Sequence, residues 1–160
     1  MSRVFSTARS AAKALHAIAG ASLVFVMLLT IMDVVLRGFG KPIPGTYELV
    51  GYAGGIAIGL AMPMTSWRRA HVYVDAFVLR LPAAARLVLH VATRLLGAGL
   101  FAVLAWNLVL LGLDLRRSGE VSPTLELEFY PVVFGLAAAA VLQAIVLLCQ
   151  AAAAQRGENE

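Results

Sequence analysis

The chain has 160 residues, of which 61% are apolar and 14% are charged. A soluble globular domain carries roughly a quarter charged residues, so this composition argues against a soluble protein and for a membrane protein. Basic residues outnumber acidic ones by 13 to 9, but they sit at the ends of the apolar runs, a placement that argues against nucleic-acid binding.

Four apolar stretches predict four membrane-spanning helices, at about 15–36, 47–67, 87–113 and 129–154. About 20 helical residues cross a hydrocarbon core of roughly 30 Å. The first stretch is longer than the apolar region of a signal peptide, about 7–15 residues, so we expect it to be retained. The runs do not alternate in polarity, which disfavours strands. The expected fold is therefore all-α, in a single membrane domain over residues 1–160.

The connections differ in character. Residues 37–46 are rich in glycine and proline and predict a tight loop, with Thr46 as the N-cap of the second helix. Residues 114–128 form a mainly polar loop. Residues 68–86 hold Val74, Phe77, Val78 and Leu81 at the spacing of one apolar helical face. We expect a short amphipathic helix in the membrane interface, with Arg68 and Arg69 on lipid phosphates; a plain connecting loop is the alternative.

The basic residues predict an orientation. Eight lie on the side that holds both termini and residues 68–86, and four lie on the opposite side. The side richer in Lys and Arg belongs in the cytoplasm, so both termini are expected there.

Charges inside membrane helices are costly, and three of them lie at one membrane level. Asp33 and Arg37 are four residues apart in the acid-first order that favours pairing on one helix face. Glu48 begins the second predicted helix at the same level. We expect the three to form one cluster that pins the first loop; an ion or substrate site is the alternative.

Arg94 lies inside the third predicted span, one turn after His90. Two interpretations stay open for it: its guanidinium reaches the inner headgroups, or it bonds to a partner subunit. The histidines also raise a haem hypothesis, because membrane cytochromes use histidine ligands. His16 and His90 are expected at similar depth, and His71 lies in the inner connection.

Small residues recur every fourth position in two of the predicted helices. They are Gly51, Gly55 and Gly59 in the second, and Gly135 and Ala139 in the fourth, where Gln143 follows on the same face. This spacing lets helices approach closely, and Gln143 is expected to bond across such an interface.

No pattern in the chain indicates catalysis. It lacks a nucleotide-binding glycine loop, a metal-ligand cluster and a nucleophile–base pair. The single cysteine, Cys149, has no partner for a disulfide or a CxxC site. The leading class is therefore a non-catalytic membrane subunit, with no metal, cofactor or bound substrate of its own.

Two stretches resemble a known family. Asp33-Val-Val-Leu-Arg37 followed by Pro42-Ile-Pro-Gly-Thr-Tyr-Glu48, and His71-Val-Tyr-Val-Asp75 followed by Leu81-Pro82 and Arg86, are similar to motifs of the small permease subunits (DctQ family) of tripartite ATP-independent periplasmic (TRAP) transporters. The resemblance spans about residues 15–150.

The resemblance implies a partner and a role. Such subunits work in the bacterial inner membrane beside a large permease subunit, which holds the substrate and ion sites. A periplasmic solute-binding protein delivers carboxylate-type solutes, and an ion gradient drives import. The small subunit is then a scaffold held by membrane lipids and by its large partner. Two other functions remain: a haem-bearing anchor of a respiratory enzyme, and a small stand-alone transporter.

Overall fold

The computed structural model describes residues 2–67 and 82–155, and these are almost entirely helical. The helices are α1 (Ser2–Gly38), α2 (Thr46–Trp67), α4 (Ala83–Ser118) and α5 (Tyr130–Gln155). All four are long and apolar enough to cross a membrane. Within the described residues there is no strand, only an isolated bridge between Val121 and Glu128. The all-α prediction with four spanning helices is confirmed.

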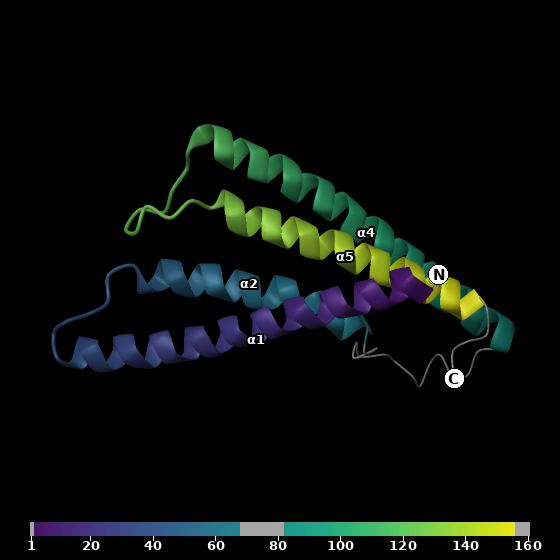
Figure 1. Ribbon diagram of the computed structural model, residues 1–160, viewed down its shortest axis with the longest axis horizontal. Coiled ribbons are helices and arrows are strands. Elements are labelled where there is room, and N and C mark those ends of the chain that lie inside the picture. The colour runs from purple at the N-terminus through teal and green to yellow at the C-terminus, as the bar shows by residue number, and fades with distance from the viewer. Residues whose placement is uncertain (1, 68–81, 156–160) are drawn as a thin grey trace.

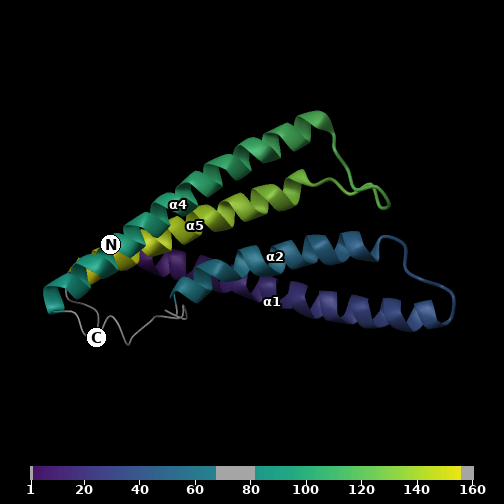
Figure 2. The ribbon, with the colours of Figure 1, turned by 180° about the vertical axis from the view of Figure 1, so that it is seen from behind.

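The helices form two antiparallel hairpins, α1 with α2 and α4 with α5, which meet mainly through α2 and α5. In Figures 1 and 2 the hairpins converge where α1 begins and α5 ends, and they diverge toward the two connecting loops. We call the end of the bundle where α1 begins and α5 ends the terminal end. We call the opposite end, which carries the two connecting loops, the loop end. The start of α1 and the end of α5 therefore lie at the same end.

The helix ends follow from local chemistry. Gly119 adopts a left-handed φ of 66° and its N–H bonds to the Leu115 carbonyl, which terminates α4. At the start of α2, the Gly45 carbonyl accepts the N–H groups of Glu48 and Leu49. Thr46 does not cap the helix as expected, because its hydroxyl donates to the Ile43 carbonyl at 2.9 Å. Gly45 occupies the cap position instead.

The core between the helices is built from small side chains. Ala19, Leu60 and Ala139 form a buried cluster where α1, α2 and α5 meet. Ala98 and Ala105 are buried on α4, and Ala137 and Ala140 on α5. Because lipid is as apolar as leucine, helices in a membrane associate through close packing, which small residues permit.

Helices α1 and α4 run further than the apolar stretches from which they were predicted. At 37 and 36 residues, α1 and α4 are each about 54–56 Å long, which exceeds the membrane core and implies tilt or protrusion. Residues 83–86, expected in the interfacial segment, are the first turn of α4. Residues 68–81 of that segment, with Arg68, Arg69, His71 and Asp75, lie outside the described residues, so the interfacial helix stays a prediction.

Candidate functional site

The first polar cluster lies at the loop end and centres on Asp33. One oxygen of its buried carboxylate accepts a hydrogen bond from the Arg37 guanidinium at 2.5 Å. The other accepts from the Ile43 backbone N–H at 2.9 Å. The predicted pair on one face of α1 is present, and its carboxylate also holds the loop that leads to α2.

We expect Arg37→Ala to destabilise the protein more than the double variant Asp33→Asn with Arg37→Ala. The single change leaves a buried carboxylate without its counter-charge, whereas the double change leaves a neutral amide that still accepts from Ile43. The thermal unfolding midpoint in detergent measures this, and the double variant is expected to recover several degrees. Equal midpoints for the two variants would contradict a stabilising ion pair.

Glu48 does not join the Asp33 cluster as expected. Its carboxylate crosses to the loop between α4 and α5, where it accepts three hydrogen bonds. The donors are the Ser122 hydroxyl at 2.7 Å, the Thr124 N–H at 2.8 Å and the Leu125 N–H at 3.0 Å. The second loop folds back over the start of α2, which brings the Ser122 hydroxyl and two backbone N–H groups within hydrogen-bond distance of Glu48.

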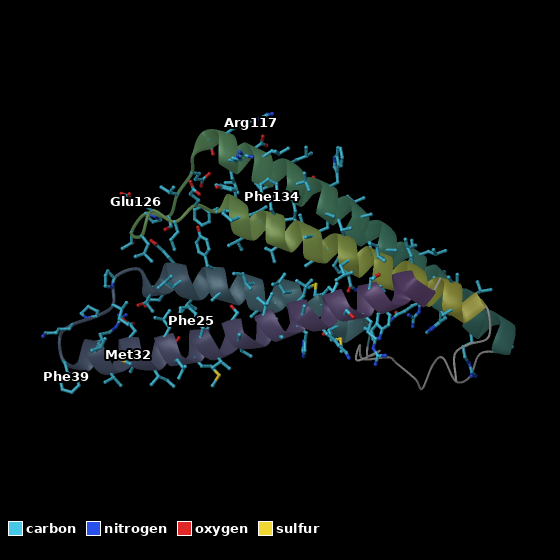
Figure 3. All side chains as sticks on the ribbon, in the orientation of Figure 1. Phe25, Met32, Phe39, Arg117, Glu126 and Phe134 are labelled. Atoms are coloured by element: carbon cyan, nitrogen blue, oxygen red, sulfur yellow. The ribbon has the colours of Figure 1, made fainter. Side chains whose placement is uncertain are left out.

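Further contacts hold this second loop against α2. The Tyr52 hydroxyl donates to the Leu127 carbonyl at 2.9 Å, and the Tyr52 ring stacks on Phe129 with centroids 5.2 Å apart. The Ser122 hydroxyl accepts from the Leu127 N–H at 3.2 Å, which closes the loop on itself. Glu126, at the loop tip in Figure 3, has a positive φ of 53°. The two hairpins are thus joined at the loop end by polar bonds and a ring stack, in addition to the packing of α2 on α5.

A second polar cluster joins α2 to α5 toward the terminal end. The Gln143 amide donates to the Ser66 hydroxyl at 2.5 Å, and the Gln150 amide donates to the Ser66 carbonyl at 2.5 Å. Gln143 is only 2% exposed and Ser66 only 1%. The prediction that Gln143 bonds across a helix interface is confirmed, and its partner is another helix of the same chain.

Arg94 belongs to this second cluster. It is 6% exposed, and its guanidinium donates to the side-chain oxygen of Gln150. The sequence interpretations of Arg94 did not include this bond to another helix of the same chain. Gln150 therefore bridges α4 to α2: its oxygen accepts from Arg94 and its amide donates to Ser66.

The glycine pattern divides into two kinds of position. A side chain at Gly59 would collide with Leu136 of α5, so this glycine does allow a close approach. Gly51, Gly55 and Gly135 have open space where a Cβ would stand. The sequence did not single out Gly112 of α4, which packs against the Phe134 ring between α4 and α5 (Figure 3).

The residues that the sequence reasoning missed are the partners of those it found. They are Tyr52, Ser66, Ser122, Thr124 and Gln150. One of them could have been found from the sequence: Gln150, like Gln143, is a polar residue within an apolar run, and such a residue in a membrane helix needs a hydrogen-bond partner. Among the described residues, no group of three or more His, Cys, Asp or Glu side chains is placed to hold a metal ion. The arrangement joins helices to one another.

Comparison with known proteins gives one match. Residues 26–157 match the family described as tripartite ATP-independent periplasmic transporters, DctQ component. No curated protein and no solved structure matches the chain. The matched region contains both polar clusters and covers most of the chain. This multi-pass membrane protein therefore belongs to the DctQ family and is a small component of a TRAP transporter.

Proposed function

We propose that this subunit is the fixed, non-catalytic partner of the large permease subunit in a TRAP transporter. The large subunit carries the substrate and ion sites and moves relative to a scaffold, to which this chain contributes. The complex imports carboxylate-type solutes, delivered by a periplasmic binding protein, and an ion gradient drives the import. A moving domain needs a part of the complex that keeps its shape in the bilayer.

The bonding of the polar side chains within the bundle supports this role. Asp33, Glu48, Arg94 and Gln143 each bond within this chain. The last three of these residues bond to a different helix or to the loop of the other hairpin. A polar residue inside a membrane segment is by default a candidate for a transport pathway. Here these residues are used to hold the helices together, as a scaffold requires.

The proposed orientation places the terminal end of the bundle in the cytoplasm. The excess of Lys and Arg around the termini and residues 68–86 supports it. In the bacterial inner membrane, the loop end then faces the periplasm. A green fluorescent protein fused after Glu160 is expected to fluoresce, and alkaline phosphatase at the same position is expected to be inactive. The reverse pattern would overturn this orientation.

Co-purification tests the proposed function. This chain carries an affinity tag, is expressed with its large subunit and is extracted in a mild detergent. We expect the large subunit to be recovered with it, and solute uptake by proteoliposomes to need both subunits and the binding protein. If the large subunit is never recovered, or if it transports equally well alone, the proposal fails.

Membership in a transporter family favours this function over a haem-bearing anchor. The two are separated by an absorption spectrum of the purified protein, in which a Soret band that is lost on His90→Ala would favour the anchor. Uptake by liposomes that contain this chain alone would favour a stand-alone transporter.

A further inference from the structure

Helix α4 lies at the edge of the bundle, with α5 between it and the α1–α2 hairpin over most of its length (Figures 1 and 2). Its buried positions are Arg94, Ala98, Ala105 and Gly112, which form one stripe at helical spacing. This stripe faces α5, as the bond from Arg94 to Gln150 and the contact of Gly112 with Phe134 show.

A second stripe runs along the opposite side of α4. Two residues along a helix turn by about 200°, so from Leu96 onward the residues two positions before or after a buried one point away from α5. These positions are exposed, and we call the stripe the outward face of α4; it consists of Leu96, Leu100, Val103, Asn107, Leu110 and Asp114.

Asn107 is the unexpected member of this face. The candidate span in α4 is Val88–Ser118, so Asn107 lies four residues, about 6 Å, from its midpoint. Its amide donates one hydrogen bond, to the Val103 carbonyl of its own helix at 2.8 Å. Within the described part of the chain, its side-chain oxygen accepts no hydrogen bond. Lipid tails cannot supply the missing donor, so exposure to lipid leaves a polar group unsatisfied in hydrocarbon.

The exposed face of α1 provides a contrast. It carries many large apolar residues, such as Leu28, Met32 and Val34, and these suit lipid. Thr30, an exposed polar residue among them, donates its hydroxyl to the Val26 carbonyl at 2.7 Å, which is the usual way for threonine to be satisfied in a lipid-facing helix. An asparagine amide cannot be satisfied in this way, because it has a second N–H and a strong acceptor.

Gly99 adds a second observation on the same side of α4. It is exposed, about two turns before Asn107, and a Cβ built there meets no atom within 4 Å. A glycine at such a position lets the backbone of another helix approach, and close approach brings a partner side chain within reach of Asn107. The glycine and the asparagine therefore favour the same occupant, a protein helix.

We propose that the outward face of α4, centred on Asn107, is the surface on which a membrane helix of the large subunit docks. That helix brings a hydrogen-bond donor to the Asn107 side-chain oxygen at mid-membrane depth. This inference rests on the proposed function and adds the face and the residue through which the two subunits meet.

The first test replaces Asn107 with leucine. Asn107→Leu suits lipid and leaves the packing on α5 untouched, so the isolated chain is expected to stay helical and monodisperse. Because one interhelical hydrogen bond is lost, recovery of the large subunit at limiting concentration is expected to fall roughly fivefold. Thr30→Leu makes a matched change on α1 and is expected to leave recovery unchanged. Wild-type recovery with Asn107→Leu would overturn the inference.

The second test does not depend on how well a variant folds. A photo-reactive amino acid at Leu110 is expected to form a cross-link with the large subunit, and the same group at Met32 on α1 is not. A cross-link from Leu110 to a second copy of this chain, or to lipid alone, would overturn the inference. If the wild-type chain recovers no large subunit, the proposed function itself fails; if it does, and neither test shows an effect, only the docking face is wrong.

Discussion

Glu48→Ala is expected to release the loop between α4 and α5 from the start of α2. The carboxylate accepts hydrogen bonds from the Ser122 hydroxyl and from the N–H groups of Thr124 and Leu125. Within the described residues, these three donors have no other acceptor. Hydrogen bonds to a charged acceptor are stronger than neutral ones, so losing it affects all three donors together. Exchange of the Thr124 and Leu125 amide hydrogens is expected to speed up by about 10- to 100-fold.

A matched control is available in the same loop. Glu120 is exposed, so Glu120→Ala removes the same charge without removing an anchor, and exchange at Thr124 and Leu125 is expected to stay at its wild-type rate. Glu48→Gln keeps one acceptor oxygen and is expected to give an intermediate rate. If Glu48→Ala and Glu120→Ala change exchange equally, the effect is one of overall charge and the anchoring role is wrong.

The loosened loop also has a consequence for transport. In the proposed orientation and function, the loop faces the periplasm, from which a solute-binding protein would deliver the solute, so a freed loop is expected to lower uptake while subunit recovery stays normal. The Tyr52 hydroxyl still holds the Leu127 carbonyl in this variant. The change is therefore local, and the four helices are expected to keep their packing.

The four long helices of the described residues could be predicted from the sequence because the thickness of the bilayer sets their minimum length. A span needs about 20 apolar residues, and the four apolar stretches each supply that many. The ends were less well predicted because a helix continues for as long as its backbone bonds form, whether or not its residues are apolar. This is why α1 begins near Ser2 and α4 extends to Ser118.

The partners of the polar side chains could not be predicted in the same way. Asp33 and Arg37 were paired correctly because four residues along one helix settle the geometry. Arg94 and Gln150 are 56 residues apart and meet only because α4 packs along α5. Likewise, Glu48 lies at the membrane level of Asp33, but which loop folds over it depends on how the two hairpins come together.

The glycines of α2 show the same limit most sharply, and they allow a direct test. Their spacing identifies one face of the helix but does not show which part of that face meets another helix. Gly59 and Gly55 lie one turn apart, yet a side chain at Gly59 collides with Leu136, whereas one at Gly55 meets open space. Gly59→Leu is therefore expected to force α2 and α5 apart, and Gly55→Leu is its matched control.

We expect Gly59→Leu to lower the free energy of unfolding by about 3 kcal/mol, the upper part of the range for overpacking. Gly59→Ala should cost less, because the Leu136 side chain can rotate away from a single methyl group but not from a whole isobutyl group. Gly55→Leu should leave unfolding of the isolated subunit within about 0.5 kcal/mol of wild type. Unfolding in a sodium dodecyl sulfate titration, followed by circular dichroism, measures all three. If Gly55→Leu and Gly59→Leu lower the free energy of unfolding equally, the destabilisation arises within α2 itself. If only Gly59→Leu lowers it, the destabilisation arises from the contact of Gly59 with Leu136 of α5.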